Sequence, residues 1–334
     1  MMMDKARTLR LVTLAVLLLG VLLLLTACRG ALAPESEQKQ AEQMKIGFVP
    51  KALNQEFWIT SKAGAEDAEK QLSGVQVLVD AGTSELAIDE QIAVVEDMLT
   101  KQVDALAVAP TAPDQLQPVL ERASKQVPVI IIDSDIPGWD GKVSYIGTDN
   151  VKGGEVAGEY IVDQLKGGGT LALMNGVPGA TSGEDRITGV RNAVEGTDVE
   201  VVQEVAADFD RAKGVSAMED ILQRNPDVDA VFAANDQMAL GALEVLKSRG
   251  KTGDVLLVGY DGTEEATVAI IEDEGIAATV AQNPYKMGLV GVKEAVNAAK
   301  DKPVPKTINT GVSLVTPENA KSYLQEYRER LGKQ

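Results

Sequence analysis

The sequence alternates short apolar runs with longer amphipathic stretches over most of its length. The longer stretches have helical spacing; in 86–99, Ile88, Ile92, Val95 and Leu99 recur at three- and four-residue steps. Wholly apolar strands that alternate with helices indicate parallel sheets covered on both faces. The predicted strands are 45–50, 75–80, 105–109, 127–133, 143–148, 170–175, 200–206, 230–234, 255–260 and 277–281.

Ten strands would form a very long single sheet, and strongly twisted open sheets rarely exceed about ten strands, so two sheets are favoured. The alternation also breaks near 147–150. A chain of 334 residues with a hydrophobic fraction of 45% can build two cores of ordinary size. We therefore predict an α/β fold with two doubly wound, parallel-sheet lobes.

The N-terminal segment has the layout of a secretory signal peptide. A basic start is followed by an apolar run over 11–25 and by Leu25-Thr26-Ala27-Cys28. This end resembles the lipobox of bacterial lipoproteins, which are cut before a cysteine that then carries acyl chains. We expect a signal peptide at 1–27, lipid attachment at Cys28, and a flexible tether over 28–43. An uncut membrane anchor is the alternative, although the apolar run is shorter than the ~20 residues that span a membrane.

Composition argues for binding rather than catalysis. The chain has no histidine, which is the commonest general base and metal ligand. Its only cysteine, Cys28, would carry the lipid, so no thiol nucleophile remains. The net charge of −18 would repel nucleic acid and anionic lipid. We expect no enzymatic activity, no cofactor, no metal and no nucleic-acid partner.

Polar side chains follow several predicted strands. Ligands of open parallel sheets bind beyond the carboxyl ends of the strands, so these positions are candidate contacts. Turn and helix-cap chemistry is the alternative for Asp and Asn, but not for Gln282. The positions are Asp133, Asn235, Asp236, Asp261 and Gln282, with Lys51, Asn54, Gln55, Phe57 and Trp58 after the first strand.

These side chains suit a neutral, polyhydroxylated ligand. Carboxylates accept from hydroxyls, amides donate and accept, and aromatic faces cover the C–H side of a sugar ring. Phe57, Trp58 and Phe209 are predicted to lie in loops, although aromatic residues more often belong to the core. The charged neighbours Asp208 and Asp210 argue against a core position for Phe209.

In these segments the chain resembles the ribose-type periplasmic sugar-binding proteins, the substrate-binding components of ATP-driven importers. The resemblance extends over roughly 44–316. The motifs that carry it are Thr148-Asp149-Asn150 with Gly153-Gly154, 207–214 (ADFDRAKG), 231–243 (VFAANDQMALGAL), 258–263 (VGYDGT) and 278–282 (ATVAQ).

The resemblance implies a monosaccharide held between two lobes. Arg186 would offer a fork of donors to neighbouring hydroxyls; a surface ion pair with Glu184 or Asp185 is the alternative for this arginine. The implied contacts are Gln55, Phe57, Trp58 and Asp133 from the first lobe, and Arg186, Phe209, Asn235, Asp261 and Gln282 from the second.

Two positions depart from the ribose-binding pattern. Ser134 stands where ribose binders have arginine, and Gln55 stands where they have asparagine. Lys51 and the run 133–135 resemble relatives that bind a furanose quorum signal. A pentose such as ribose, or a related sugar, is expected first, with the furanose signal as an alternative and Lys51 and Ser134 as further contacts.

The resemblance also implies the type I periplasmic binding protein fold, with a three-strand hinge near 148–149, 282–284 and 309–311. Lobe 1 would be 44–148 plus 283–309, and lobe 2 would be 149–282 plus 310–334. The lobes would close around the sugar and deliver it to an ABC permease. We expect a monomer outside the cytoplasm, in the periplasm or at the cell surface, held to the membrane by its lipid.

Three other classes of function compete with transport. A sensor would present the sugar to a chemoreceptor or kinase, and the sequence does not separate this from import. A repressor of the lactose-repressor family would carry a DNA-binding helix-turn-helix in place of the signal peptide. A phosphate-binding enzyme would need a glycine motif, but 167–169 and 176–183 match neither common form; the second reads as the loop that carries Arg186.

Overall fold

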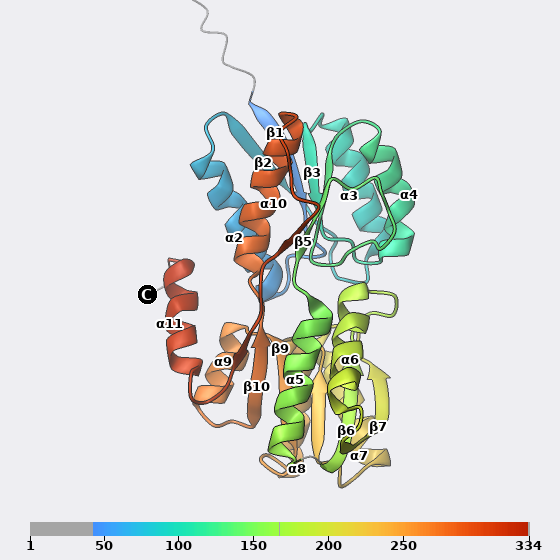
Figure 1. Ribbon diagram of the computed structural model, residues 1–334, viewed down its shortest axis with the longest axis vertical. Helices are drawn as coiled ribbons and strands as arrows, with labels where there is room; N and C mark the ends of the chain where they lie inside the picture. The colour runs from blue at the N-terminus through green and yellow to red at the C-terminus, as the bar shows by residue number, and fades with distance from the viewer. Residues whose placement is uncertain (1–42, 167, 333–334) are drawn as a thin grey trace, which may run out of the picture. The chain divides into compact units, whose positions relative to one another are not determined.

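The computed structural model describes residues 43–166 and 168–332. These residues form two six-stranded sheets and the helices that cover them (Figure 1). The predicted α/β fold of two doubly wound sheets is confirmed. The signal peptide, Cys28 and the tether as far as residue 42 lie outside the described residues.

The first sheet is parallel throughout and has the strand order β11-β5-β4-β3-β1-β2. Its strands are β1 (Met44–Val49), β2 (Val75–Val79), β3 (Ala105–Val108), β4 (Val129–Ile132), β5 (Ser144–Gly147) and β11 (Thr307–Asn309). Its helices are α2 (Glu56–Gln71), α3 (Ile88–Thr100), α4 (Pro113–Ser124) and α10 (Pro284–Ala299).

Both faces of this sheet are buried, which explains its continuously apolar strands. Ile130 and Ile132 of β4 pack in the cluster that includes residues of α2 and α10. Val129 and Ile131 of the same strand pack on the other side, with residues of α3 and α4. Successive side chains of one strand therefore enter two separate cores.

The second sheet has the order β12-β10-β9-β8-β6-β7, and it is parallel except for β12, which runs antiparallel to β10. Its strands are β6 (Gly168–Asn175), β7 (Asp198–Ala206), β8 (Ala230–Ala233), β9 (Leu256–Asp261), β10 (Ile276–Ala281) and β12 (Ser313–Val315). Its helices are α5 (Asn150–Gln164), α6 (Thr181–Val194), α7 (Arg211–Arg224), α8 (Asp236–Arg249), α9 (Glu264–Ile271) and α11 (Ala320–Arg330).

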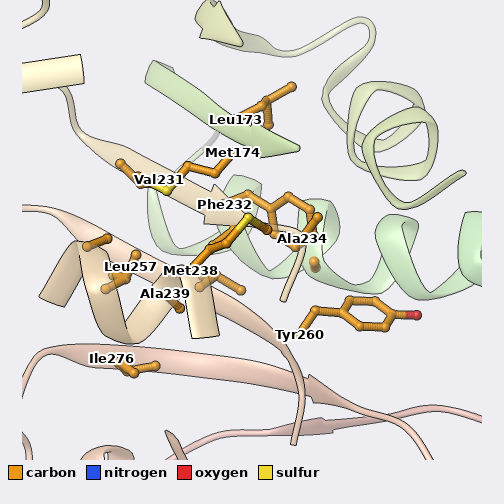
Figure 2. Packing of buried hydrophobic residues seen from close by; sticks show 14 of the residues in the cluster. Leu173, Met174, Val231, Phe232, Ala234, Met238, Ala239, Leu257, Tyr260 and Ile276 are labelled. Carbon is orange, nitrogen blue, oxygen red and sulfur yellow. The ribbon is translucent and has the colours of Figure 1, made fainter. Parts of the chain in front are cut away.

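The core of the second sheet is a single cluster of buried side chains. Figure 2 shows part of it, with Val231 and Phe232 of β8, Leu257 of β9 and Met238 of α8 among the packed residues. Tyr260 is fully buried at the end of β9, beside the region where the polar side chains gather.

Two strands were not predicted from the sequence. Strands β11 and β12 have only three residues each, and β11 is mostly exposed. They therefore lack the apolar run by which the other strands are recognised. The antiparallel pairing of β12 also departs from the expectation of wholly parallel sheets.

The chain passes from one sheet to the other at three places. The first is between β5 and α5, the second between β10 and α10, and the third between β11 and β12. Thr310 N, on the third segment, donates to Gly147 O at the end of β5 over 2.8 Å. The crossing segments are thus hydrogen-bonded to each other rather than independent linkers.

Within 43–166 and 168–332, no helix is both long and apolar enough to span a bilayer.

Candidate functional site

A pocket lies where the carboxyl ends of strands from both sheets meet. This is the ligand-binding edge of parallel sheets. Its lining includes nearly all the residues expected to contact a ligand. The lining residues are Lys51, Gln55, Phe57, Trp58, Glu85, Asp133, Ser182, Arg186, Phe209, Asn235, Asp261 and Gln282.

One corner of the pocket is a buried charge cluster on the first sheet. Lys51 Nζ lies 3.1 Å from Asp133 Oδ2 and 3.9 Å from Glu85 Oε2. Trp58 Nε1 donates to Glu85 Oε1 over 2.6 Å. Burial raises the pKa of Glu85, and Lys51 opposes this rise. The lysine thus offsets the cost of two carboxylates held away from water.

Ser134 does not line the pocket but contacts a residue that does, Asp133. Its hydroxyl lies 2.9 Å from Asp133 Oδ2 and 3.0 Å from the hydroxyl of Ser182. Since a hydroxyl carries one proton, Ser182 donates to Ser134 when Ser134 donates to Asp133. This contact links the first sheet to α6 of the second.

Arg186 is fixed on α6 with its guanidinium facing the pocket. Its Nε donates to Asn150 Oδ1 over 2.9 Å, and its Nη1 donates to the carbonyl of Ala234 over 2.8 Å. The guanidinium carbon lies 4.0 Å from the centre of the Tyr260 ring, a stacked cation–π arrangement. With 3% of its surface exposed, Arg186 is not the surface ion-pair residue of the alternative interpretation.

Asp261 and Gln282 line the pocket at the ends of β9 and β10 in the second sheet. Gln282 Nε2 donates to Asp261 Oδ1 over 2.7 Å, and Arg186 Nη1 lies 3.6 Å from the same oxygen. Burial raises the pKa of Asp261, while Arg186 opposes the rise. A further hydrogen bond from a ligand to this pocket-lining carboxylate would lessen the cost of burying its charge.

Three aromatic side chains enclose the space between these polar groups. The rings of Phe57 and Trp58 meet edge to face with centroids 4.8 Å apart. Phe209 packs against Gly176, where a Cβ would come within 2.0 Å of its ring. The carbonyl of Phe209 accepts from Gln55 Nε2 and from Asn235 Nδ2, both over 3.2 Å.

Three of the lining residues have an unfavourable backbone. The φ angles of Asp133, Phe209 and Asp261 are 63°, 57° and 122°, in a region that residues with side chains seldom adopt. Such conformations cost about 1–3 kcal/mol each and cluster at functional sites. The strain is consistent with selection of these positions for their side-chain direction rather than for stability.

Several expectations need correction. Phe57 and Trp58 lie in the first turn of α2 rather than in a loop, because the helix begins at Glu56. Arg186 lies on α6, which begins at Thr181, rather than in a loop. Asp236 does not line the pocket, and its carboxylate accepts from Thr263 and Thr279 instead.

Glu85 and Ser182 line the pocket but were not found from the sequence. Glu85 lies in the loop before α3, at no strand end, and is brought in by Trp58. Asn235 is both a lining residue and the N-cap of α8, where it accepts from Met238 N, so cap chemistry and site chemistry coincide. Across the described ranges, no group of three or more acidic side chains is arranged to hold a metal.

Comparison with known proteins places these features in a family. The model of the family described as "periplasmic binding protein domain" matches residues 46–303. The ribose import binding protein of Bacillus subtilis is 38% identical over 307 residues, which are 90% of this chain and 98% of that protein. The D-allose-binding periplasmic protein of Escherichia coli is 36% identical over 265 residues, which are 77% of this chain and 85% of that protein.

A solved structure agrees with this placement. The ABC transporter solute-binding protein of Bacillus halodurans, with bound myo-inositol, has a TM-score of 0.80 and 29% identity and covers 86% of this chain and 100% of its own. The fold thus has counterparts both in sequence and in structure. The chain belongs to the periplasmic binding protein domain family, whose members are binding proteins rather than enzymes.

Proposed function

We propose that this protein is the sugar-binding component of an ABC importer and holds one monosaccharide of the ribose or allose type in the pocket. The observation that carries the proposal is the convergence of Asp133, Arg186, Asp261 and Gln282, from separate segments, on one small space. The relatives named for ribose import and for D-allose binding support it, because they match across most of their lengths.

The charge of the pocket favours an uncharged ligand. Two cations, Lys51 and Arg186, are paired with Asp133 and Asp261 at 3.1 and 3.6 Å. A charged ligand would have to displace one of these partners and leave a buried charge uncompensated, which costs several kcal/mol. Sugar hydroxyls can instead accept from the cations and donate to the carboxylates without breaking either pair.

The aromatic side chains that line the pocket favour a single sugar ring. The rings of Phe57, Trp58 and Phe209 can cover the apolar faces of one ring. An oligosaccharide would need space that these side chains occupy.

We further propose that lobe 1 comprises 44–148 and 283–309, and lobe 2 comprises 149–282 and 310–334, which move about the three crossing segments. The sheet membership of β11 and β12 supports these limits, because the two strands pair with different sheets. A sugar that contacts both lobes only when they are close shifts the population toward the closed form. The closed form would then be the one that the permease recognises.

The place of action follows from the N-terminal sequence. We propose that residues 1–27 are removed during export and that Cys28 carries the lipid, so that the protein works outside the cytoplasm on a tether. Labelling of the protein in bacteria with a radioactive fatty acid tests this proposal. Label on the wild type but not on Cys28→Ala is the expected result, and label on neither contradicts it.

Isothermal titration calorimetry with a panel of uncharged ligands tests the binding proposal. The panel comprises D-ribose, D-allose, D-arabinose, D-galactose and myo-inositol, together with a furanose signal, which the presence of Lys51 in the pocket favours as the second candidate. We expect one site per chain and micromolar or tighter affinity for at least one pentose or hexose. No heat of binding from any of these ligands would refute the proposal.

A further inference from the structure

A second set of contacts joins the two halves of the molecule outside the pocket, and we call it the rim contact (Glu56, Thr60, Glu264 and Tyr327). Glu56 is the first residue of α2, a helix of the first sheet. Its Oε1 accepts from the backbone N of Glu264 over 2.7 Å and from the hydroxyl of Tyr327 over 2.6 Å. Both donors belong to helices of the second sheet, α9 and α11.

The hydroxyl of Tyr327 has two partners, which fixes the direction of both hydrogen bonds. The second partner is Thr60 Oγ1 on α2, at 2.9 Å. A phenol carries one proton, and the carboxylate of Glu56 can only accept, so Thr60 donates to Tyr327 and Tyr327 donates to Glu56. Thr60 and Tyr327 are 4% and 5% exposed, so these hydrogen bonds are shielded from water.

The backbone amide of Glu264 is suited to a carboxylate from another part of the molecule. Glu264 is the first residue of α9, where amides have no acceptor within the helix and the helix dipole favours negative charge. The side chain of Glu264 is itself neutralised by Arg328, whose Nε and Nη2 both lie 2.7 Å from its Oε1. Two neighbouring residues of α11 thus donate to the two carboxylates of the rim contact: Tyr327 to Glu56, and Arg328 to Glu264.

The rim contact lies next to the pocket in both of the segments that it joins. Glu56 stands between Gln55 and Phe57, which line the pocket, and Glu264 follows three residues after Asp261. The intervening Gly262 is held by α11, since the hydroxyl of Tyr323 donates to its carbonyl over 2.7 Å. Helix α11 therefore contacts the loop that follows Asp261 and, through Tyr327, the first turn of α2.

We infer that Glu56 and Tyr327 are positioning residues for sugar binding, which hold the two lobes together at the rim of the pocket and thereby slow the release of the sugar. The inference rests on the proposed function, because it assigns these residues to the closed, sugar-holding form. Neither residue lines the pocket. Their effect is therefore on the lifetime of the closed form rather than on direct recognition of hydroxyls.

The test is Tyr327→Phe, which removes one hydroxyl and keeps the ring. Hydrogen bonds to a charged acceptor are among the stronger ones in proteins, so we expect about tenfold weaker binding of the best-bound panel sugar. The loss should appear as faster dissociation, with a nearly unchanged association rate, in stopped-flow tryptophan fluorescence. The matched control is Tyr160→Phe, whose hydroxyl donates within the second sheet, to Ala277 O over 3.4 Å, and we expect it to bind like the wild type.

A second measurement follows hydrogen exchange of the Glu264 amide by NMR, with and without the best-bound panel sugar. The sugar populates the closed form, so it should slow this exchange in the wild type, and Glu56→Ala should remove the slowing. Unchanged dissociation in Tyr327→Phe, or a Glu264 amide that exchanges equally fast in sugar-bound wild type and sugar-bound Glu56→Ala, would overturn the inference. Failure of every panel sugar to bind to the wild type would instead refute the proposed function.

Discussion

The hydroxyl of Thr148 donates a hydrogen bond of 2.7 Å to Gln282 Oε1 and so joins two of the three crossing segments. The amide nitrogen of the same glutamine donates a hydrogen bond to Asp261 Oδ1 in the pocket. Gln282 therefore connects a crossing segment to a carboxylate in the pocket. We predict that these two consecutive hydrogen bonds couple movement of the lobes to recognition of the ligand.

Replacement of Thr148 tests this coupling. Thr148→Val keeps the shape of the side chain but removes the donor, so the amide of Gln282 loses its orientation toward Asp261. We expect sugar affinity to fall about fivefold, as for the loss of one neutral hydrogen bond of ~1 kcal/mol. Thr148→Ser retains the donor and should bind within about twofold of the wild type. Equal calorimetric affinities for the valine and serine variants would contradict the coupling.

Arg186 should not be replaceable by lysine. A single ammonium cannot reach Asn150 Oδ1 and Ala234 O together while it faces the pocket, as the planar guanidinium does. We expect Arg186→Lys to weaken sugar binding at least tenfold. Arg191→Lys is the matched control on the same helix, because Arg191 forms an exposed ion pair with Glu204. Wild-type affinity for Arg186→Lys in titration calorimetry would show that charge alone suffices.

Much of the pocket could be predicted from the sequence because parallel sheets place strand ends together. Asp133, Asp261 and Gln282 directly follow or end apolar strands, so their positions in the chain already indicated one edge of a sheet. The resemblance to sugar-binding proteins added Arg186, which no strand end marks. The pocket lining contains both groups.

The remainder depended on contacts between segments far apart in the sequence. Glu85 enters the pocket because Trp58 donates to it across 27 positions of the chain, and no local pattern encodes that pairing. Tyr327 meets Glu56 across 271 positions. Strands β11 and β12 have only three residues each, too few to be recognised from the sequence, and their pairing follows from where the crossings place them.

The close approach of α5 and α6 positions Arg186 and should be sensitive to a single methyl group. A Cβ on Gly154 would lie 2.1 Å from the carbonyl oxygen of Arg186. Gly154→Ala should therefore lower the free energy of unfolding by about 1–3 kcal/mol and also weaken sugar binding, since α6 must move.

Gly168→Ala is the control for this overpacking, because a Cβ there meets Asp198 Cβ at an ordinary distance of 3.5 Å. Urea unfolding and calorimetry on both variants decide the matter. A Gly154→Ala protein that unfolds and binds like the wild type would show that α5 and α6 can accommodate the extra methyl group without loss of stability.

The pH dependence of stability should depend on Asp236. Burial raises the pKa of Asp236 to about 7, against the hydrogen bonds from Thr263 and Thr279 that favour the charged form. The folded protein then binds more protons than the unfolded chain between about pH 4 and pH 7, so the free energy of unfolding falls as the pH rises through this range. Above it, the contribution of this group is constant.

Asp236→Asn cannot titrate and should show a smaller fall. The difference between wild type and variant should be on the order of 4 kcal/mol between pH 4 and pH 7, from a pKa shift of about three units. Urea denaturation at several pH values measures it. Parallel pH profiles for the two proteins would contradict the assignment of this titration to Asp236.

A crystal structure of the protein grown with its best-bound panel sugar is the most direct test of the central claim. We predict density for one sugar ring between Phe209 and the pair Phe57–Trp58, with hydroxyls within hydrogen-bond distance of Asp133, Arg186 and Asp261. Sugar bound elsewhere, with the pocket between the two sheets unaltered, would contradict the account.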